Sequence, residues 1–231
     1  VRRVFDTTPL NVFSSADNPI KTPKDLEGKS IGAPPGDSQR QVWPAFAKAN
    51  GIDSSKVTWV NVEPAAKIAA LAEKRVDAVA DYTTGLPLYE KPMGEGNVVM
   101  MPWAENGFDM YSMSIIASEK TMTERPDALK KFLEASYKGW RDVMADPEAA
   151  MVIFKKRVPE IDEKLLGANM AMGLQLMQTD RYKENGIGWI EKEKMCSSVD
   201  TVNTYMGLPK EVSCDDVFTT EFLTKIDMPA N

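Results

Sequence analysis

The feature that most constrains the fold is a regular alternation of strand-like and helix-like segments in the first half of the chain. Apolar runs typical of buried strands cover residues 29–33, 57–62, 76–82 and 98–102. Helical patterns at 38–50 and 64–75 separate the first three runs, and Ile68, Leu71 and Ala72 share one face of the second helix. Such a run with short connections forms a parallel sheet with right-handed crossovers and helices on both faces. The sequence therefore predicts a compact α/β lobe.

The loop that leads into the first of these helices carries the strongest candidate binding groups. Ser38, followed three residues later by Gln41, fits a capping box. A strand that feeds a glycine-containing loop into a helix N-terminus leaves free N–H groups and the positive end of the helix dipole. Helix capping alone is the competing interpretation. The candidate ligand-binding residues are Gly36, Asp37, Ser38 and Gln39.

A second group of candidates follows the strand predicted at 76–82. Asp81 and Tyr82 lie at its carboxyl end, where open α/β sheets place the groups that contact ligands. An aspartate that only caps the turn at Thr83 and Thr84 is the competing interpretation. Both residues are therefore candidates for contacting a ligand.

Aromatic and acidic side chains gather shortly after the last strand of this lobe. An aromatic face with nearby carboxylates suits a flat heterocycle, through stacking and hydrogen bonds. Packing at the hinge is the competing interpretation for the tryptophan. The candidates are Trp103, Glu105, Asp109 and Tyr111.

The second half of the chain is dominated by helices. One strand is predicted at 111–117, and helices follow at 126–145, 147–156, 162–179 and 191–205. The apolar stripe of the first helix needs a sheet to pack on. Before residue 20 the sequence offers one strand at best, at 5–14, because Pro9 interrupts it. The helical half therefore lacks strands of its own.

Composition excludes several classes of function. A net charge of −6 and a pI near 5.0 argue against nucleic acid as a partner, because phosphate binding needs a basic surface. The chain has no histidine, which excludes Ser-His-Asp and Cys-His nucleophile systems and histidine-based zinc sites. We therefore expect a binding protein with no catalytic residue, no metal site and no cofactor.

The two cysteines leave the redox state open. Cys196 and Cys214 allow one disulfide and cannot build a metal site by themselves. A bridge is expected only in an oxidising compartment, and two free thiols remain the alternative.

Segments along nearly the whole chain occur in the order typical of one family. They read IKTPKDLEGKSIGAPPGDSQRQVWPAFAKANGID, VDAVADY, MPWAENGFDMYSMSIIASE, RPDALKKFLEASYKGWRDVMADPEAA, NGIGWIEKEKM and DDVFTTEFL. In these segments the chain resembles the NMT1/THI5-like and SsuA-like periplasmic solute-binding proteins. Members of that family serve ABC importers of sulfonates, nitrate and thiamine-pyrimidine precursors.

The resemblance implies an α/β, two-lobed, periplasmic binding protein type II-like fold with the ligand held between the lobes. Residues 1–20 would be a hinge strand and a remnant of the first lobe, and 21–105 the complete lobe. Residues 106–231 would form the return crossing and the helix-rich part of the first lobe. Family members begin with several strands and helices that this chain lacks, so the first lobe is incomplete.

The expected function is that of a periplasmic or otherwise extracytoplasmic substrate-binding protein that delivers a small molecule to an ABC permease. No signal-peptide pattern opens the chain, so such a peptide has been removed or was never present. The ligand would be similar to a thiamine-pyrimidine precursor, or another nitrogenous or sulfonate compound. Asp37 favours a nitrogenous ligand, because a carboxylate repels a sulfonate.

Two other interpretations stay open. The same fold hosts enzymes similar to pyrimidine synthases and desulfinases, but family synthases use histidine, and Cys196 lies in a helix that packs the lobe. The chain could instead be a truncated fragment that forms a homo-dimer through its incomplete lobe. In that case we expect the interface near the strands at 5–14 and 111–117, because short open sheets tend to pair with another chain.

Overall fold

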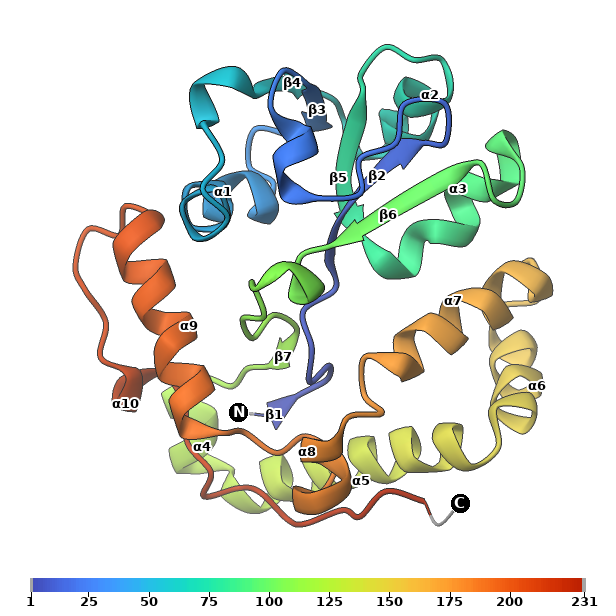
Figure 1. The fold of residues 1–231 in the computed structure, drawn as a ribbon. Helices are drawn as coiled ribbons and strands as arrows, with labels where there is room; N and C mark the ends of the chain where they lie inside the picture. The colour runs from blue at the N-terminus through green and yellow to red at the C-terminus, as the bar shows by residue number, and fades with distance from the viewer. Residues whose placement is uncertain (1, 230–231) are drawn as a thin grey trace. The chain divides into compact units, whose positions relative to one another are not determined.

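The computed structural model describes residues 2–229, which divide into two compact units (Figure 1). Unit 2 consists of Pro9–Asp109 and Asp200–Glu211. Unit 1 takes the described residues up to Thr8, then Met110–Val199, and those from Val212 onward. The three-part division expected from the sequence, 1–20, 21–105 and 106–231, stays a prediction.

Unit 2 is built on a five-stranded sheet with the order β4-β3-β5-β2-β6. Strand β3 pairs in parallel with β4 and β5, whereas β2 is antiparallel to both of its neighbours, β5 and β6. The strands are β2 (Leu10–Ser15), β3 (Ser30–Ala33), β4 (Thr58–Asn61), β5 (Ala78–Tyr82) and β6 (Val98–Pro102).

The prediction of a parallel sheet is therefore wrong at one strand. The chain inserts β2 between two strands that run the opposite way, and its Val12 and Phe13 are fully buried there. Because β2 has a partner on each side, residues 10–14 do not offer the open edge that we expected a second copy to pair with.

Helices cover both faces of this sheet (Figure 1). Tyr89 of α3 and Leu71 of α2 pack with Phe13 and Val79 in one core. The sequence did not predict α3, because it contains two prolines, at the start and inside the helix. The helices and 3-10 turns are η1 (Pro23–Leu26), α1 (Ser38–Ala49), η2 (Ser54–Lys56), η3 (Pro64–Ala66), α2 (Lys67–Ala72), η4 (Thr83–Gly85), α3 (Leu86–Met93) and η5 (Ala104–Asn106).

Unit 1 is almost entirely helical. Its strands are two residues long: β1 (Arg2–Arg3) pairs antiparallel with β7 (Ser114–Ile115), so the strand predicted at 111–117 is much shorter in the structure. Tyr137, Tyr182 and Ile187 lie in its buried core. Its helices are α4 (Glu119–Glu124), α5 (Pro126–Ala145), α6 (Pro147–Arg157), α7 (Glu163–Gln175), α8 (Asp180–Asn185), α9 (Lys192–Tyr205, which passes into unit 2 at Asp200) and α10 (Cys214–Val217).

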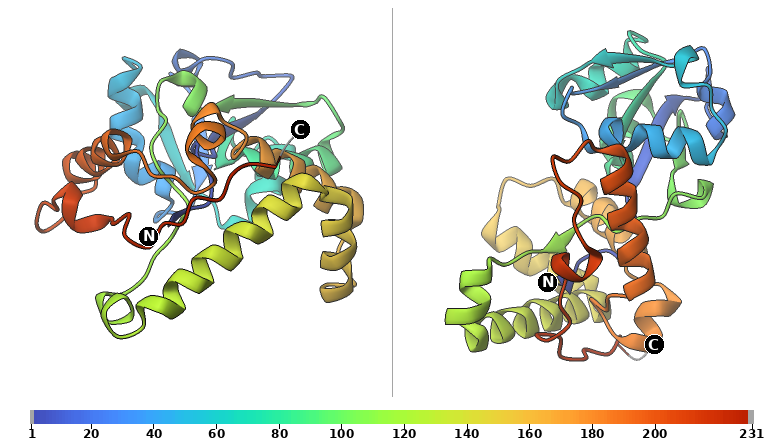
Figure 2. Two further views of the ribbon diagram at one scale, coloured as in Figure 1. Left: turned by 90° about the horizontal axis from the view of Figure 1, so that it is seen from below. Right: turned by 90° about the vertical axis from the view of Figure 1, so that its left-hand side faces the viewer.

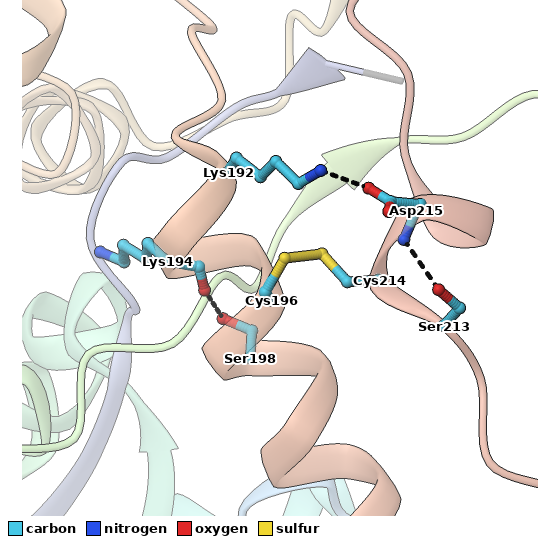
Figure 3. Close-up of a disulfide and its surroundings, with 7 residues drawn as sticks. All are labelled: Lys192, Lys194, Cys196, Ser198, Ser213, Cys214 and Asp215. Carbon is cyan, nitrogen blue, oxygen red and sulfur yellow. Dashed lines mark hydrogen bonds and ion pairs between the residues drawn. A yellow bond between two sulfur atoms is a disulfide. The ribbon is translucent and has the colours of Figure 1, made fainter.

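A disulfide ties the C-terminal segment to α9 (Figure 3). It joins Cys196 to Cys214, so of the two redox states left open by the sequence the structure has the bridge. Beside it, the Lys192 Nζ lies 2.6 Å from an Asp215 carboxylate oxygen. Ser213 caps the short helix α10 by accepting a hydrogen bond from the Asp215 backbone N–H.

Helix α6 leaves the end of α5 at a steep angle (Figure 2). None of its described residues is buried, although it carries a run of four apolar side chains. Val152 is 57% exposed, Ile153 64% and Phe154 44%. Helix α6 therefore presents an apolar surface to solvent.

Candidate functional site

The polar groups of unit 2 converge where its parallel strands end. Because β3, β4 and β5 run in the same direction, their carboxyl ends share one edge of the sheet. Each leads into a helical segment, and each of those segments contributes a charged or polar side chain. We call the group Asp37, Gln39, Lys67, Asp81 and Tyr89 the polar edge.

Asp37 begins the first of these helices. Its carboxylate accepts a hydrogen bond of 2.9 Å from the Gln39 backbone N–H, so Asp37, not Ser38, is the N-cap of α1. The predicted capping box is therefore wrong: Gln41 instead donates to the Gly36 carbonyl at 3.3 Å. The extended backbone of Asp37 suits an N-cap, and a carboxylate there also interacts favourably with the helix dipole.

Lys67 is the residue that the sequence analysis missed. Its side chain is only 8% exposed. The ammonium donates to the Ala80 carbonyl at 2.7 Å and to an Asp37 carboxylate oxygen at 3.3 Å, and it lies 3.9 Å from Asp81. A buried lysine needs such partners, because an isolated charge in the interior is costly.

A signal for Lys67 is present in the sequence. The buried residues of α2 are Lys67, Ala70 and Leu71, which are three and four residues apart and therefore share a face. The predicted face used Ile68 and Ala72 with Leu71, but Ala72 is exposed. A lysine on the apolar face of a helix indicates a buried ammonium group, which needs a hydrogen-bonding or charged partner in the interior.

Asp81 and Tyr89 form the third part of the polar edge. The Tyr89 hydroxyl donates a hydrogen bond of 2.6 Å to Asp81, whose other oxygen accepts from the Tyr82 N–H at 2.9 Å. Burial, and then the negative charge of Asp81, raise the pKa of the Tyr89 phenol far above its usual range. Tyr89 therefore keeps its proton and acts as a donor that orients the Asp81 carboxylate.

Asn11 of β2 adds an unusual buried amide next to this cluster. In the sheet it stands opposite Asp81 on one side and Pro102 on the other. It is fully buried, and its side-chain oxygen and nitrogen have no hydrogen-bond partner among the described residues. Gln39 uses only the Asn11 backbone, to which its amide donates at 2.6 Å. Buried amides without a partner are rare, so a bound water or ligand group is expected there.

The other predicted site residues of unit 2 differ in their availability. Gly36 is exposed on the loop, Ser38 is exposed as the first residue of α1, and Tyr82 is 38% exposed. Glu105 is exposed on η5, and Asp109 is half-buried at the end of the unit. The side-chain hydrogen bonds and ion pairs described for the polar edge use no side chain of Ser38, Tyr82 or Glu105.

Trp103 is placed in the core instead. It is fully buried and stacks on Phe46, with ring centroids 4.1 Å apart and planes 9° apart. Trp43 and Phe108 complete this aromatic cluster. Burial favours packing over the stacking on a ligand that we expected, because no face of the ring reaches the surface.

Tyr111 belongs to unit 1. Its backbone N–H donates to the Ser198 hydroxyl at 2.9 Å, and its own hydroxyl accepts from the Glu191 N–H at 3.2 Å. The Lys194 ammonium stands 4.9 Å from the centre of its ring. These contacts hold Tyr111 against α9 within its own unit.

Grooves in unit 1 are weaker candidates than the polar edge. One, of about 350 Å³, lies between the end of α8 and the C-terminal segment, and the other, of about 540 Å³, lies between the start of α9 and that segment. Trp189 lines both. None of the charged residues that line them is buried: they are Glu184, Lys225, Glu191 and Lys192. In the polar edge, by contrast, the side chain of Lys67 is only 8% exposed.

Two searches of residues 2–229 bear on metals and membranes. Over this part of the chain, no cluster of three or more acidic, cysteine or histidine side chains could hold a metal ion. In the same residues, every helix is too short or too polar to cross a bilayer.

Comparisons with known proteins agree with the resemblance. The sequence profile described as NMT1/THI5 like matches residues 1–150. The riboflavin-binding protein RibY of Chloroflexus aurantiacus is 25% identical over 228 residues, which are 96% of this chain and 64% of RibY. This chain thus spans about two thirds of the length of that curated relative.

Solved structures share the fold. The periplasmic aliphatic sulphonate binding protein SsuA of Escherichia coli has a TM-score of 0.64 at 15% identity, over 98% of this chain and 72% of SsuA. A putative periplasmic sulfonate-binding SsuA of Methylobacillus flagellatus KT has a TM-score of 0.65 at 15% identity, over 96% and 66%. The predicted family resemblance and the type II-like α/β fold class are confirmed.

Proposed function

The chain belongs to the NMT1/THI5-like family, and on that basis we propose that it is the substrate-binding component of an ABC importer. It works outside the cytoplasm, captures a small organic molecule and delivers it to a permease. The observation that carries this proposal is the polar edge, a set of oriented side chains at the carboxyl ends of parallel strands. Ligands of open α/β sheets bind at that end.

The chemistry of the polar edge supports a nitrogenous ligand over a sulfonate. Asp37 and Asp81 supply carboxylate oxygens, which accept hydrogen bonds and repel anions. A heterocycle with amino or ring N–H groups, such as a thiamine-pyrimidine precursor, complements these acceptors. The SsuA proteins are described as sulfonate binders and RibY as a riboflavin binder; the carboxylates favour a ligand of the second kind.

Binding without turnover is supported by the reactive groups that the chain can offer. A synthase of the family type would need histidine, and the chain has none. A desulfinase would need a nucleophilic thiolate, but both cysteines are joined in the disulfide. The enzyme alternative therefore lacks its nucleophile.

A thermal-shift panel tests the proposal. The probes are riboflavin, 4-amino-2-methylpyrimidine, ethanesulfonate and nitrate, each at millimolar concentration. A compound present at 100 times its Kd stabilises the native state by about 2.7 kcal/mol, which raises Tm by several degrees. We expect the N–H-bearing probes to raise Tm and to be recovered unchanged by chromatography. Steady conversion of a bound probe into product would overturn the transport function.

A further inference from the structure

The charges of the polar edge are arranged around one atom. The Lys67 Nζ lies 3.3 Å from an Asp37 oxygen and 3.9 Å from an Asp81 oxygen. The three side chains come from the starts of α2 and α1 and from the end of β5, and they are 8%, 14% and 30% exposed. Tyr89 of α3 also faces this cluster, as a neutral donor to Asp81.

One ammonium between two carboxylates leaves a net charge of minus one. Both carboxylates approach the same nitrogen, so without Lys67 they would repel each other in a poorly hydrated place. With Lys67 present, the two acids can stay close together and keep a fixed orientation. The remaining negative charge is not balanced by any other contact that the structure gives to this cluster.

The acids keep acceptor capacity for a ligand. A carboxylate has about four lone-pair positions. Asp37 uses one oxygen for the Gln39 N–H and the other for Lys67. Asp81 accepts from Tyr82 and Tyr89 and is twice as exposed as Asp37, at 30% against 14%. Asp81 is therefore the better placed of the two to meet a ligand, and Asp37 mainly balances the charge of Lys67.

We propose that Lys67 is a specificity-determining residue: it fixes Asp81 toward the ligand and, with Asp37, sets the charge of the polar edge to minus one. An edge of this charge admits neutral or cationic heterocycles with N–H donors and rejects sulfonate and nitrate. This inference rests on the proposed function, which it extends from a site to the residue that tunes its selectivity. The orphaned amide of Asn11, opposite Asp81 in the sheet, offers a further donor and acceptor beside it.

The test uses three variants of the whole chain: Lys67→Met, Asp37→Asn and the double variant Lys67→Met/Asp37→Asn. Affinities for 4-amino-2-methylpyrimidine and ethanesulfonate are measured by calorimetry, and stability by the urea midpoint. The matched control is the exposed pair Lys74–Asp17, which is 2.9 Å apart with side chains 68% and 74% exposed. Lys74→Met and Asp17→Asn should change neither measurement, because exposed ion pairs contribute little.

Charge balance predicts a specific pattern. Lys67→Met should lower the urea midpoint and weaken aminopyrimidine binding about tenfold or more, since two partly buried carboxylates lose their shared partner. The double variant restores the net charge of minus one and should regain most of both losses. Asp37→Asn alone leaves a neutral edge, so its preference for the aminopyrimidine over ethanesulfonate should fall by about tenfold.

Each of the other outcomes contradicts a distinct claim. If the double variant is as damaged as Lys67→Met, Lys67 acts through packing and its bond to Ala80, and the charge-balance proposal is wrong. If the wild type prefers ethanesulfonate, the selectivity is wrong while the import function stands. If neither probe binds, the ligand class and the selectivity assigned to Lys67 both fail, and the urea midpoints report only whether Lys67 balances charge in the folded state.

Discussion

In unit 2, hydrogen bonds hold one partly exposed carboxylate in place. Glu27, which follows η1, accepts from the Asp53 backbone N–H at 2.9 Å and from Lys24 and Lys56 at 2.9 and 3.2 Å. The bond from Asp53, and then those from the lysines, lower the pKa of Glu27 from 4.5 to about 2. The carboxylate thereby clips the segment before β3 to the turn η2.

This clip predicts a pH dependence. A carboxyl group with a lowered pKa in the folded state contributes stability above about pH 4.5, and that contribution is lost as the pH falls toward 2. Carbon-detected NMR should show Glu27 titrating near 2. A Glu27 midpoint near 4.5 would mean that the clip does not form in solution.

Some residues of the candidate site could be predicted from the sequence, and others could not. Asp37 and Asp81 could be predicted because loops after strands are where sheets place polar groups. Lys67 could not be predicted by the same rule, because lysine is rarely buried and its partners lie far away in sequence. Trp103 was expected near the ligand, but the structure places it in the core. This could not be predicted, because the side chains that pack against it, such as Phe46, are distant in the sequence.

At the scale of elements, the best predictions were those with local signals. The predicted bounds 126–145 and 98–102 agree with α5 and β6, since Pro126 marks the start of the helix. The antiparallel direction of β2 could not be predicted, because it depends on which strands the chain inserts between. The strand predicted at 111–117 is only two residues long in the structure, because β1 pairs with only two of its residues.

The disulfide carries the prediction that belongs to this scale. Cys196 and Cys214 are 18 residues apart, and closing a loop of that size stabilises the folded state by about 3 kcal/mol in the chain-entropy account. Urea unfolding of the wild type should therefore shift to a lower midpoint on adding a phosphine reductant. The variant Cys196→Ser/Cys214→Ser should have that lower urea midpoint both with and without the reductant. Equal midpoints in all four samples would show that the bridge contributes nothing.

At the scale of the whole molecule, the apolar surface of α6 needs an explanation. Val152 and Ile153 are more than half exposed, and the basic residues Lys155, Lys156 and Arg157 follow them directly. Acidic residues come next, at Glu160, Asp162 and Glu163. Lys155 already pairs with Glu163 of the same chain at 3.4 Å, so the apolar side chains of α6, and not these charges, would carry a contact between two copies. We therefore keep self-association as a proposal, with α6 in place of the strands predicted at 5–14 and 111–117.

Light scattering on the 231-residue chain tests this proposal. We expect a mass that rises above 25.6 kDa with concentration and approaches a dimer. Ile153→Lys should return the chain to a monomer, because it places a charge in an apolar contact. Ile116→Lys, at a residue 83% exposed near β7, is the matched control and should leave the dimer intact. A wild type that stays monomeric at every concentration would contradict self-association.

If this chain binds an N–H-bearing small molecule reversibly through Asp81, calorimetry of two matched variants will show it. Wild type and Asp17→Asn, whose aspartate is exposed, should give the same saturable heat with 4-amino-2-methylpyrimidine. Asp81→Asn should bind at least about tenfold more weakly at an unchanged fold, because a charged acceptor is replaced by a neutral amide. If Asp81→Asn binds the probe as tightly as the wild type does, Asp81 does not hold the ligand.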